Sequence, residues 1–209
     1  MVSASEFFSA EEQKKIETAV KAAETKTSGE IVPMIIDSSY NYPRAELIGG
    51  GTLALATGLV VSWAFGDESI WWFLPVFLVG FFIFQLLIRN CPGLKRQLIH
   101  PDELTAEVKE KSLVSFLERG LHETRDRTGI LILISLFERR VHVLADSGIN
   151  EKVPAHTWDE IVEIISQGLK KGTACEATCQ AIKRCGELLH DYPPQEDNNI
   201  DELPNLIVE

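Results

Sequence analysis

The sequence is short of positive charge and lacks the common signatures of catalysis. It carries 20 Lys and Arg residues against 31 Asp and Glu residues, which gives a formal net charge of −11. Because nucleic-acid binding needs a basic face, this balance excludes a general nucleic-acid binder. The chain has no glycine-rich phosphate loop, nucleophile elbow, histidine pair at zinc-ligand spacing or Cys-x-x-Cys motif. Composition and motifs therefore name no reaction.

Charge is missing altogether from two long stretches, Leu47–Phe65 and Ile70–Ile88, each of 19 residues. At about 1.5 Å per residue, such a helix is long enough to cross a hydrocarbon core of roughly 30 Å. The alternative is a buried helical hairpin in a soluble core, but helices of that kind usually carry a polar stripe. Here Gln85 is the strongly polar side chain inside either stretch. We predict a transmembrane helical hairpin over residues 47–88.

The charges that flank the two stretches predict an orientation. Arg44 precedes the first stretch, and Arg89, Lys95 and Arg96 follow the second, whereas the connecting turn at 66–69 holds two acids and no cation. The positive-inside rule then places both termini in the cytoplasm and the turn outside. We therefore expect a multi-pass protein of the bacterial cytoplasmic (inner) membrane, with the lipid bilayer as its first partner.

The cysteines could serve as metal ligands or as small buried side chains. On this topology they lie in a reducing compartment, and residues 1–37 contain no apolar segment of the kind found in a signal peptide. Cys175 and Cys179 are four residues apart on a predicted helix, a spacing that a metal site could use. Small buried thiols are the commoner role for cysteines on an apolar helix. We expect thiols rather than disulfides, with Cys175, Cys179 and Cys185 packed in the core.

Outside the hairpin, apolar periodicity predicts alternating helices and strands. Ser9 and Glu12 form a capping box at the start of one helix, which leads to a strand over residues 30–37. After the hairpin, the pattern predicts a helix over 102–125, strands at 130–136 and 140–144, and helices over 154–172 and 174–189.

Two details of this pattern are specific enough to check. The core face of the helix over 102–125 is predicted from four apolar residues: Leu113, Phe116, Leu117 and Leu121. Pro33 cannot donate a backbone hydrogen bond and predicts an edge or a bulge for the first strand.

These elements indicate one domain split by its own anchor. A lone helix and strand cannot cover both faces of the strand, so the segment before the hairpin needs partners from beyond it. The predicted fold class is α/β, one small domain interrupted by a transmembrane hairpin. Its parts are residues 1–46 and 89–190 of one cytoplasmic domain, the hairpin at 47–88 and an acidic tail at 191–209.

Four acids lie at the ends of the predicted strands. Glu30 and Asp37 bound the first strand, Asp126 precedes the second, and Asp146 follows the third. Ligands of open α/β sheets gather at strand ends, and carboxylate oxygens suit Ca²⁺ or Mg²⁺. The alternative is structural: Asp126 and Asp146 hold turns, and an arginine neutralises the pair, Arg125 or Arg127 being the candidates.

Three segments resemble motifs of the TPM domain family. The first is Lys26–Val32, the second is Thr124–Leu136 with Glu138-Arg139, and the third is Ala145–Ile149. A bacterial, membrane-embedded branch of that family, in which a two-helix insertion splits the domain, is the closer match. The resemblance extends over nearly the whole chain and implies a small α/β sandwich.

The resemblance also implies what the chain does. Relatives have been linked to acid phosphatase activity, divalent cation binding and photosystem II repair, and Asp126 and Asp146 are the positions that carry over. Two hypotheses follow. One is an interaction, scaffold or maintenance module for other membrane proteins, and the other is a divalent-metal-dependent, acid phosphatase-like phosphohydrolase.

Overall fold

The computed structural model describes residues 3–25, 27, 29–65, 70–124, 126–151, 153–154, 156–189 and 204–209. The chain forms two compact units. One unit is Tyr40–Leu104, and the other combines Val2–Ser39 with Thr105–Glu209. The second, called here the α/β unit, is thus built from the segments that precede and follow the first unit in sequence. The predicted turn at 66–69 and residues 191–203 of the predicted tail lie outside the described residues.

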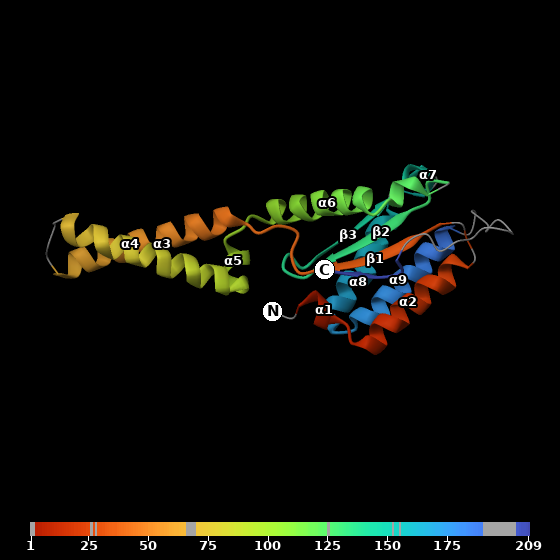
Figure 1. Cartoon of the computed structure of the whole chain (residues 1–209), viewed down its shortest axis with the longest axis horizontal. Helices are drawn as coiled ribbons and strands as arrows, with labels where there is room; N and C mark the ends of the chain where they lie inside the picture. The colour runs from red at the N-terminus through yellow and green to blue at the C-terminus, as the bar shows by residue number, and fades with distance from the viewer. Residues whose placement is uncertain are drawn as a thin grey trace. The chain divides into compact units, whose positions relative to one another are not determined.

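A four-stranded sheet in the order β3-β2-β1-β4 organises the α/β unit (Figure 1). β1 (Ile31–Ile36) runs parallel to β2 (Ile130–Ser135), which pairs antiparallel with β3 (Arg140–Ala145). β4 (Ile207–Val208) is parallel to β1. Every residue of β1 and β2 is buried, as expected for strands that are covered on both faces.

β4 makes β1 an internal strand, which the sequence did not predict. Ile35 and Asp37 exchange backbone hydrogen bonds with Glu209, so alternate residues of β1, including Pro33, turn their backbone groups toward β4. Pairing with β4 starts only at Met34. The missing N–H of Pro33 therefore faces a stretch where β4 has not yet begun, and the proline costs no ladder hydrogen bond.

Helices cover both faces of the sheet (Figure 1). On one face lie α2 (Ala10–Glu24), α8 (Thr157–Lys171) and α9 (Ala174–Leu188), and the sheet residues of that core are Ile31, Ile35, Ile130, Ile132, Ile134 and Val143. On the other face, α6 (Pro101–Glu118) contributes Val108 and Phe116. The sheet is therefore the middle layer of three.

The predicted buried face of α6 is partly wrong. Phe116 and Leu121 are buried, but Leu113 and Leu117 are 52% and 50% exposed. Ser112 and Ser115 are buried in their place. Small side chains let the helix approach the sheet closely, so apolarity alone did not identify the covered face. The helix ends at Glu118, and a 3-10 turn, η1 (Leu121–Glu123), follows Gly120.

Helix ends follow local sequence rules. The capping box of α2 is present: Glu12 N donates to Ser9 Oγ at 3.4 Å, and Ser9 N donates to Glu12 Oε2 at 2.9 Å. Gly172 ends α8 with φ of +75°, a conformation that favours glycine. Two short helices, α1 (Ala4–Phe7) and α7 (Ser147–Asn150), were not predicted.

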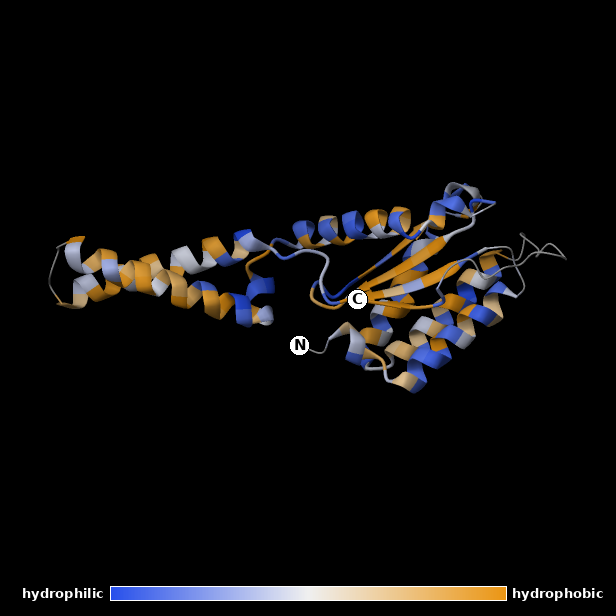
Figure 2. Cartoon of the chain, viewed as in Figure 1, coloured by the Kyte–Doolittle hydropathy of each residue, from blue (hydrophilic) through white to orange (hydrophobic). Residues whose placement is uncertain are grey.

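The other unit contains the hairpin helices α3 (Pro43–Phe65) and α4 (Ile70–Asn90), with α5 (Pro92–Gln97) after them. Among the helices that the structure describes, α3 and α4 are the two long and apolar enough to cross a membrane. Figure 2 shows both as largely hydrophobic along their length. Only Ile88 of α4 is buried, so the apolar side chains of this helix point mostly outward.

Small residues hold the two helices together. A Cβ added at Gly50 would lie 3.1 Å from the backbone nitrogen of Gln85, and Ala54 is fully buried. Such close approach of backbones is typical of helix packing in membranes. At the base of the hairpin, Lys95 Nζ contacts Glu46 Oε1 at 2.6 Å and the carbonyl of Asn41 at 2.5 Å. This ion pair joins the segment after α4 to the start of α3.

Candidate functional site

The four predicted acids lie at two opposite ends of the sheet. β1 and β2 start together, and Ala145 at the end of β3 pairs with Ile130 at the start of β2. Glu30 and Asp146 therefore lie at the same end. Asp37 follows the last residue of β1, and a six-residue strand spans about 20 Å. Asp37 is too far away to share a metal ion with the others.

The carboxylate of Asp37 accepts hydrogen bonds from the start of the described chain. Its Oδ1 accepts a hydrogen bond of 2.5 Å from Ala4 N, and its Oδ2 accepts one of 3.5 Å from Ser3 Oγ. The carboxylate thus binds the first turn of α1 and holds the start of the described chain against the sheet. Of the two acids considered as a third oxygen donor beside Asp126 and Asp146, Asp37 or Glu30, strand direction separates Asp37 from the pair.

The loops before β2 and after β3 do approach each other. Asp146 N donates to Gly129 O at 3.0 Å. A Cβ at Gly148 would meet the carbonyl oxygens of Asp126 and Arg127 at 2.5 and 2.6 Å, so only glycine fits this contact. The antiparallel pairing of β2 and β3 explains why a residue before one strand meets a residue after the other.

Asp146 is the buried member of this loop pair. Its Oδ1 accepts hydrogen bonds from Ser147 N at 2.6 Å and Ser147 Oγ at 3.1 Å, which caps α7. The Arg127 guanidinium lies 3.9 Å from the same oxygen, and Oδ2 is buried with no hydrogen-bond partner in the described part of the chain. Asp126 is exposed. For Asp146, the capping role and the arginine neighbour are those of the structural alternative.

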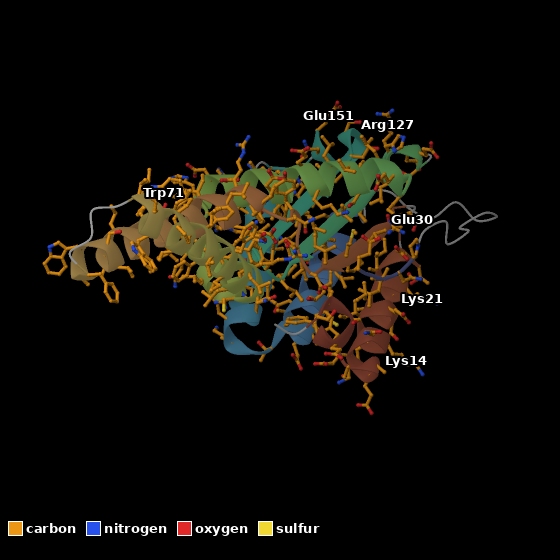
Figure 3. All side chains as sticks on the ribbon, turned by 60° about the vertical axis from the view of Figure 1, so that its left-hand side comes forward. Lys14, Lys21, Glu30, Trp71, Arg127 and Glu151 are labelled. Carbon is orange, nitrogen blue, oxygen red and sulfur yellow. The ribbon has the colours of Figure 1, made fainter. Side chains whose placement is uncertain are left out.

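Glu30 lies at the same end of the sheet, on the far side of β2. Its backbone carbonyl accepts from Ile130 N at 2.8 Å, so β2 separates it from the Asp146 loop. Figure 3 shows Glu30 at the start of β1, near the end of α2 and apart from Arg127. Across the residues that the structure describes, no three His, Cys, Asp or Glu side chains are grouped as a metal site would require.

Sequence reasoning missed a buried carboxylate with several hydrogen-bond donors, that of Glu138. It is 2% exposed in the β2–β3 turn, and its Oε1 accepts from Ser38 Oγ at 3.2 Å and from Ser39 N at 3.0 Å. Its Oε2 accepts from Ser135 Oγ. Glu138 therefore joins the end of β1 to the β2–β3 turn. An acid directly after the apolar run 130–134 was the available signal, but strand order was needed to read it.

The thiols and the half-buried histidine have shifted pKa values. Burial raises the pKa of Cys175 to about 11 and that of Cys185 to about 12, so both thiols stay protonated at neutral pH. Protonated, buried thiols are poor metal ligands and poor nucleophiles. His142 Nδ1 lies 3.1 Å from Ser112 Oγ, and burial, with Lys109 nearby, lowers the pKa of the imidazole.

Comparison with known proteins agrees with this architecture. The NMR structure of the BA42 protein from the psychrophilic bacterium Bizionia argentinensis aligns over 97% of this chain and 95% of its own, with a TM-score of 0.59. At 22% sequence identity, the likeness concerns the fold. No curated protein sequence matches significantly. A sequence model of the TPM domain family matches residues 99–188. A TPM domain therefore covers residues 99–188, all of which lie after the hairpin in sequence.

Proposed function

We propose that this protein is a membrane-anchored TPM module that holds other membrane proteins through its α/β unit, rather than an enzyme. The observation that carries the proposal is the structural use of three acids near the ends of the strands. Asp37 binds α1, Asp146 caps α7 beside Arg127, and the buried Glu138 accepts hydrogen bonds from serine hydroxyls and a backbone amide. These contacts are structural, which supports a role in binding rather than in chemistry.

An exposed apolar stripe on α6 supports the same role. Leu113, Val114 and Leu117 are 52%, 40% and 50% exposed in the α/β unit. Apolar side chains grouped on one face of a helix are typical of surfaces that contact other proteins. Copurification from membranes tests the proposal: we expect a specific membrane protein to be recovered with the wild-type chain and lost with Leu113→Ser/Leu117→Ser. The proposal would be contradicted if the wild-type chain recovered no protein beyond those that an unrelated membrane hairpin protein also recovers.

We infer further that α3 and α4 span the cytoplasmic membrane, with the α/β unit inside the cell. The described cations of the hairpin unit, from Arg44 to Arg96, lie at one end of the helix pair, and the aromatic side chains of Trp63, Trp71 and Trp72 lie at the other. This asymmetry supports an inward-facing base. Reporter fusions test this topology: a reporter joined at Glu209 should be active in the cytoplasm, and a reporter joined at Asp67 should be active outside. Outside activity at Glu209 would reverse the topology.

A metal-dependent phosphohydrolase is the second candidate. It is supported by one observation, the buried Oδ2 of Asp146, which faces no donor in the described chain. A Ca²⁺ or Mg²⁺ ion there would find oxygens from Asp146 and from the carbonyls of the neighbouring loop. If the site binds Ca²⁺, millimolar Ca²⁺ should raise the melting temperature of the wild type but not of Asp146→Ala.

Phosphatase turnover separates the two candidates. Turnover of a phosphate monoester by the purified full chain with Mg²⁺ or Ca²⁺, abolished by Asp126→Asn or Asp146→Asn, would establish the enzyme and remove our preference. The interaction module requires instead that turnover stays at background in all three proteins. Melting of each variant shows whether loss of activity comes from loss of fold.

A further inference from the structure

On the side of β1 that faces away from β2, the strand pairs with residues near position 209, far along the chain. Residues 204–209 follow α9 in sequence after the interval 190–203. Glu209 N donates to Ile35 O and Asp37 N donates to Glu209 O, both at 2.9 Å. Met34 pairs with Ile207, and Ile35 pairs with Val208. The segment therefore adds a parallel strand to the sheet by backbone hydrogen bonds.

Side chains fix the register of this added strand. Ile207 is 7% exposed and packs in the core on the α6 side, whereas Leu206 and Val208 pack against the opposite core. The carboxylate of Glu209 forms an ion pair with Arg119, and Lys111 Nζ lies 4.0 Å from its Oε2. Lys111 comes from α6, and Arg119 directly follows the last residue of that helix. Backbone pairing, three apolar residues and one acid thus define what the β1 edge accepts.

We propose that the β1 edge is a strand-acceptor site that also takes residues 204–209 of a second copy of this chain, so that two chains exchange their last described strands. A second copy is the occupant that the contacts fit, because exchange reproduces each backbone, apolar and charged contact of the single chain. Swapping identical elements is a low-cost route to a dimer.

Two features of the chain favour exchange: the length of the segment that connects α9 to β4, and the hairpin. The 14 residues 190–203 can reach up to about 48 Å when extended, which allows the strand to reach a neighbour. Within one chain the strand competes at an effective concentration set by that connection. A hairpin in a bilayer would confine copies to one surface and raise the concentration of neighbours, so exchange should depend on the amount of protein per lipid.

Disulfide trapping tests the exchange in the full chain. Two chains with different affinity tags, one carrying Met34→Cys and the other Ile207→Cys, are reconstituted together in vesicles after Cys91→Ser in both. Mild oxidation should give a disulfide between the two tagged chains, and its yield should rise as the protein-to-lipid ratio rises. Burial raises the pKa of Cys175 and Cys185, so these thiols should react slowly.

Three controls decide the outcome. Both cysteines in one chain should form the internal disulfide, and its absence would show that the pairing, and with it the proposal, is wrong. Replacing Met34→Cys with Ile31→Cys, three residues away on β1, should abolish the product between chains. Arg119→Glu in both chains should reduce it. An internal disulfide that forms readily while mixed chains never cross-link would overturn exchange, whatever the protein does as a binding module or enzyme.

Discussion

The two units of this protein use apolar side chains in opposite ways. In the α/β unit, Ile132 of β2 is fully buried, and the helices carry hydrophilic as well as hydrophobic residues (Figure 2). In the hairpin, Leu78 is 47% exposed and Trp71 is 81% exposed, and Figure 3 shows Trp71 projecting from its helix. Small residues such as Gly50 and Ala54 occupy the contact between α3 and α4 instead.

The difference shows what drives each unit to assemble. Burying apolar surface away from water stabilises the α/β unit by about 25 cal/mol per Å². Between helices in lipid that driving force is absent, and close van der Waals packing between small residues replaces it. Substitutions that shorten a large side chain should therefore harm the first unit, and substitutions that enlarge a small one should harm the second.

Ile132→Ala should have the largest effect on this comparison. It removes a fully buried side chain from the middle of β2 and leaves a cavity, which should lower the free energy of unfolding of the α/β unit by about 2–5 kcal/mol. Leu78→Ala on α4 is the matched control and should leave that melting transition unchanged. Equal losses in both variants, measured by denaturant unfolding in detergent, would show that the hairpin shares the core of the α/β unit.

Glu138→Ala should come next. It removes the acceptor of Ser38 Oγ, Ser39 N and Ser135 Oγ, and hydrogen bonds to charged groups are each worth about 1.5–3 kcal/mol. We expect a loss of roughly 2–3 kcal/mol in the α/β unit. The exposed Glu118→Ala serves as the control. Hydrogen exchange should also quicken at Ser39, and unchanged protection there would argue against the proposed link between β1 and the turn.

Gly50→Ala should weaken the hairpin by about 1 kcal/mol, because the added methyl group meets the backbone of Gln85. Gly51→Ala is a strict control, since its nearest contact would be a Phe81 ring atom at 3.9 Å. Fluorescence transfer between labels on α3 and α4, followed during denaturation in detergent, measures helix association. The same loss in both variants would mean that Gly50 is not at the contact.

His142 should make the stability of the α/β unit depend on pH. Its pKa is lowered in the folded state, so the unfolded chain binds more protons once the pH falls below about 6.5. Stability should be full above that pH and decline on acidification. The slope, read from melting between pH 7.5 and about 5, should flatten in His142→Gln. Lys109→Gln should flatten it partly, because Lys109 disfavours the charged imidazole.

Removing the hairpin should have the smallest effect. Joining residue 39 to residue 105 by a flexible linker keeps every contact within the α/β unit. We expect one cooperative melting transition, with β4 retained through residue 209. Two separate transitions, or loss of protection in β1, would show that the segment before the hairpin depends on the membrane unit for its fold.

The sequence predicted the local elements well and their arrangement less well. The capping box at Ser9, the apolar strand from Ile130 and the hairpin each depend on neighbouring residues, and each is present. The face of α6 was misread because Ser112 and Ser115, rather than Leu113 and Leu117, lie against the sheet. The apolar pattern could not show that α6 lies close to the sheet, and this closeness favours small side chains on the face that contacts the sheet.

The candidate site shows the same division. Sequence reasoning brought the loops of Asp126 and Asp146 together because a strand pair joined by a short turn must be antiparallel. It also offered Asp37 or Glu30 as a third donor beside them, and Asp37 follows the far end of β1. The direction of β1 relative to β2 depends on a pairing across the whole hairpin insertion, which no local pattern encodes.

By itself, the sequence determined that two charge-free stretches form helices long enough to cross a membrane, since charge and length belong to one contiguous segment. It also determined which residues prefer strands and which prefer helices. Only the tertiary structure decided that the Glu138 carboxylate is buried and that residues 207–208 complete the sheet. Both facts require residues far apart in sequence to meet, and such meetings follow from strand order and register rather than from the local chain.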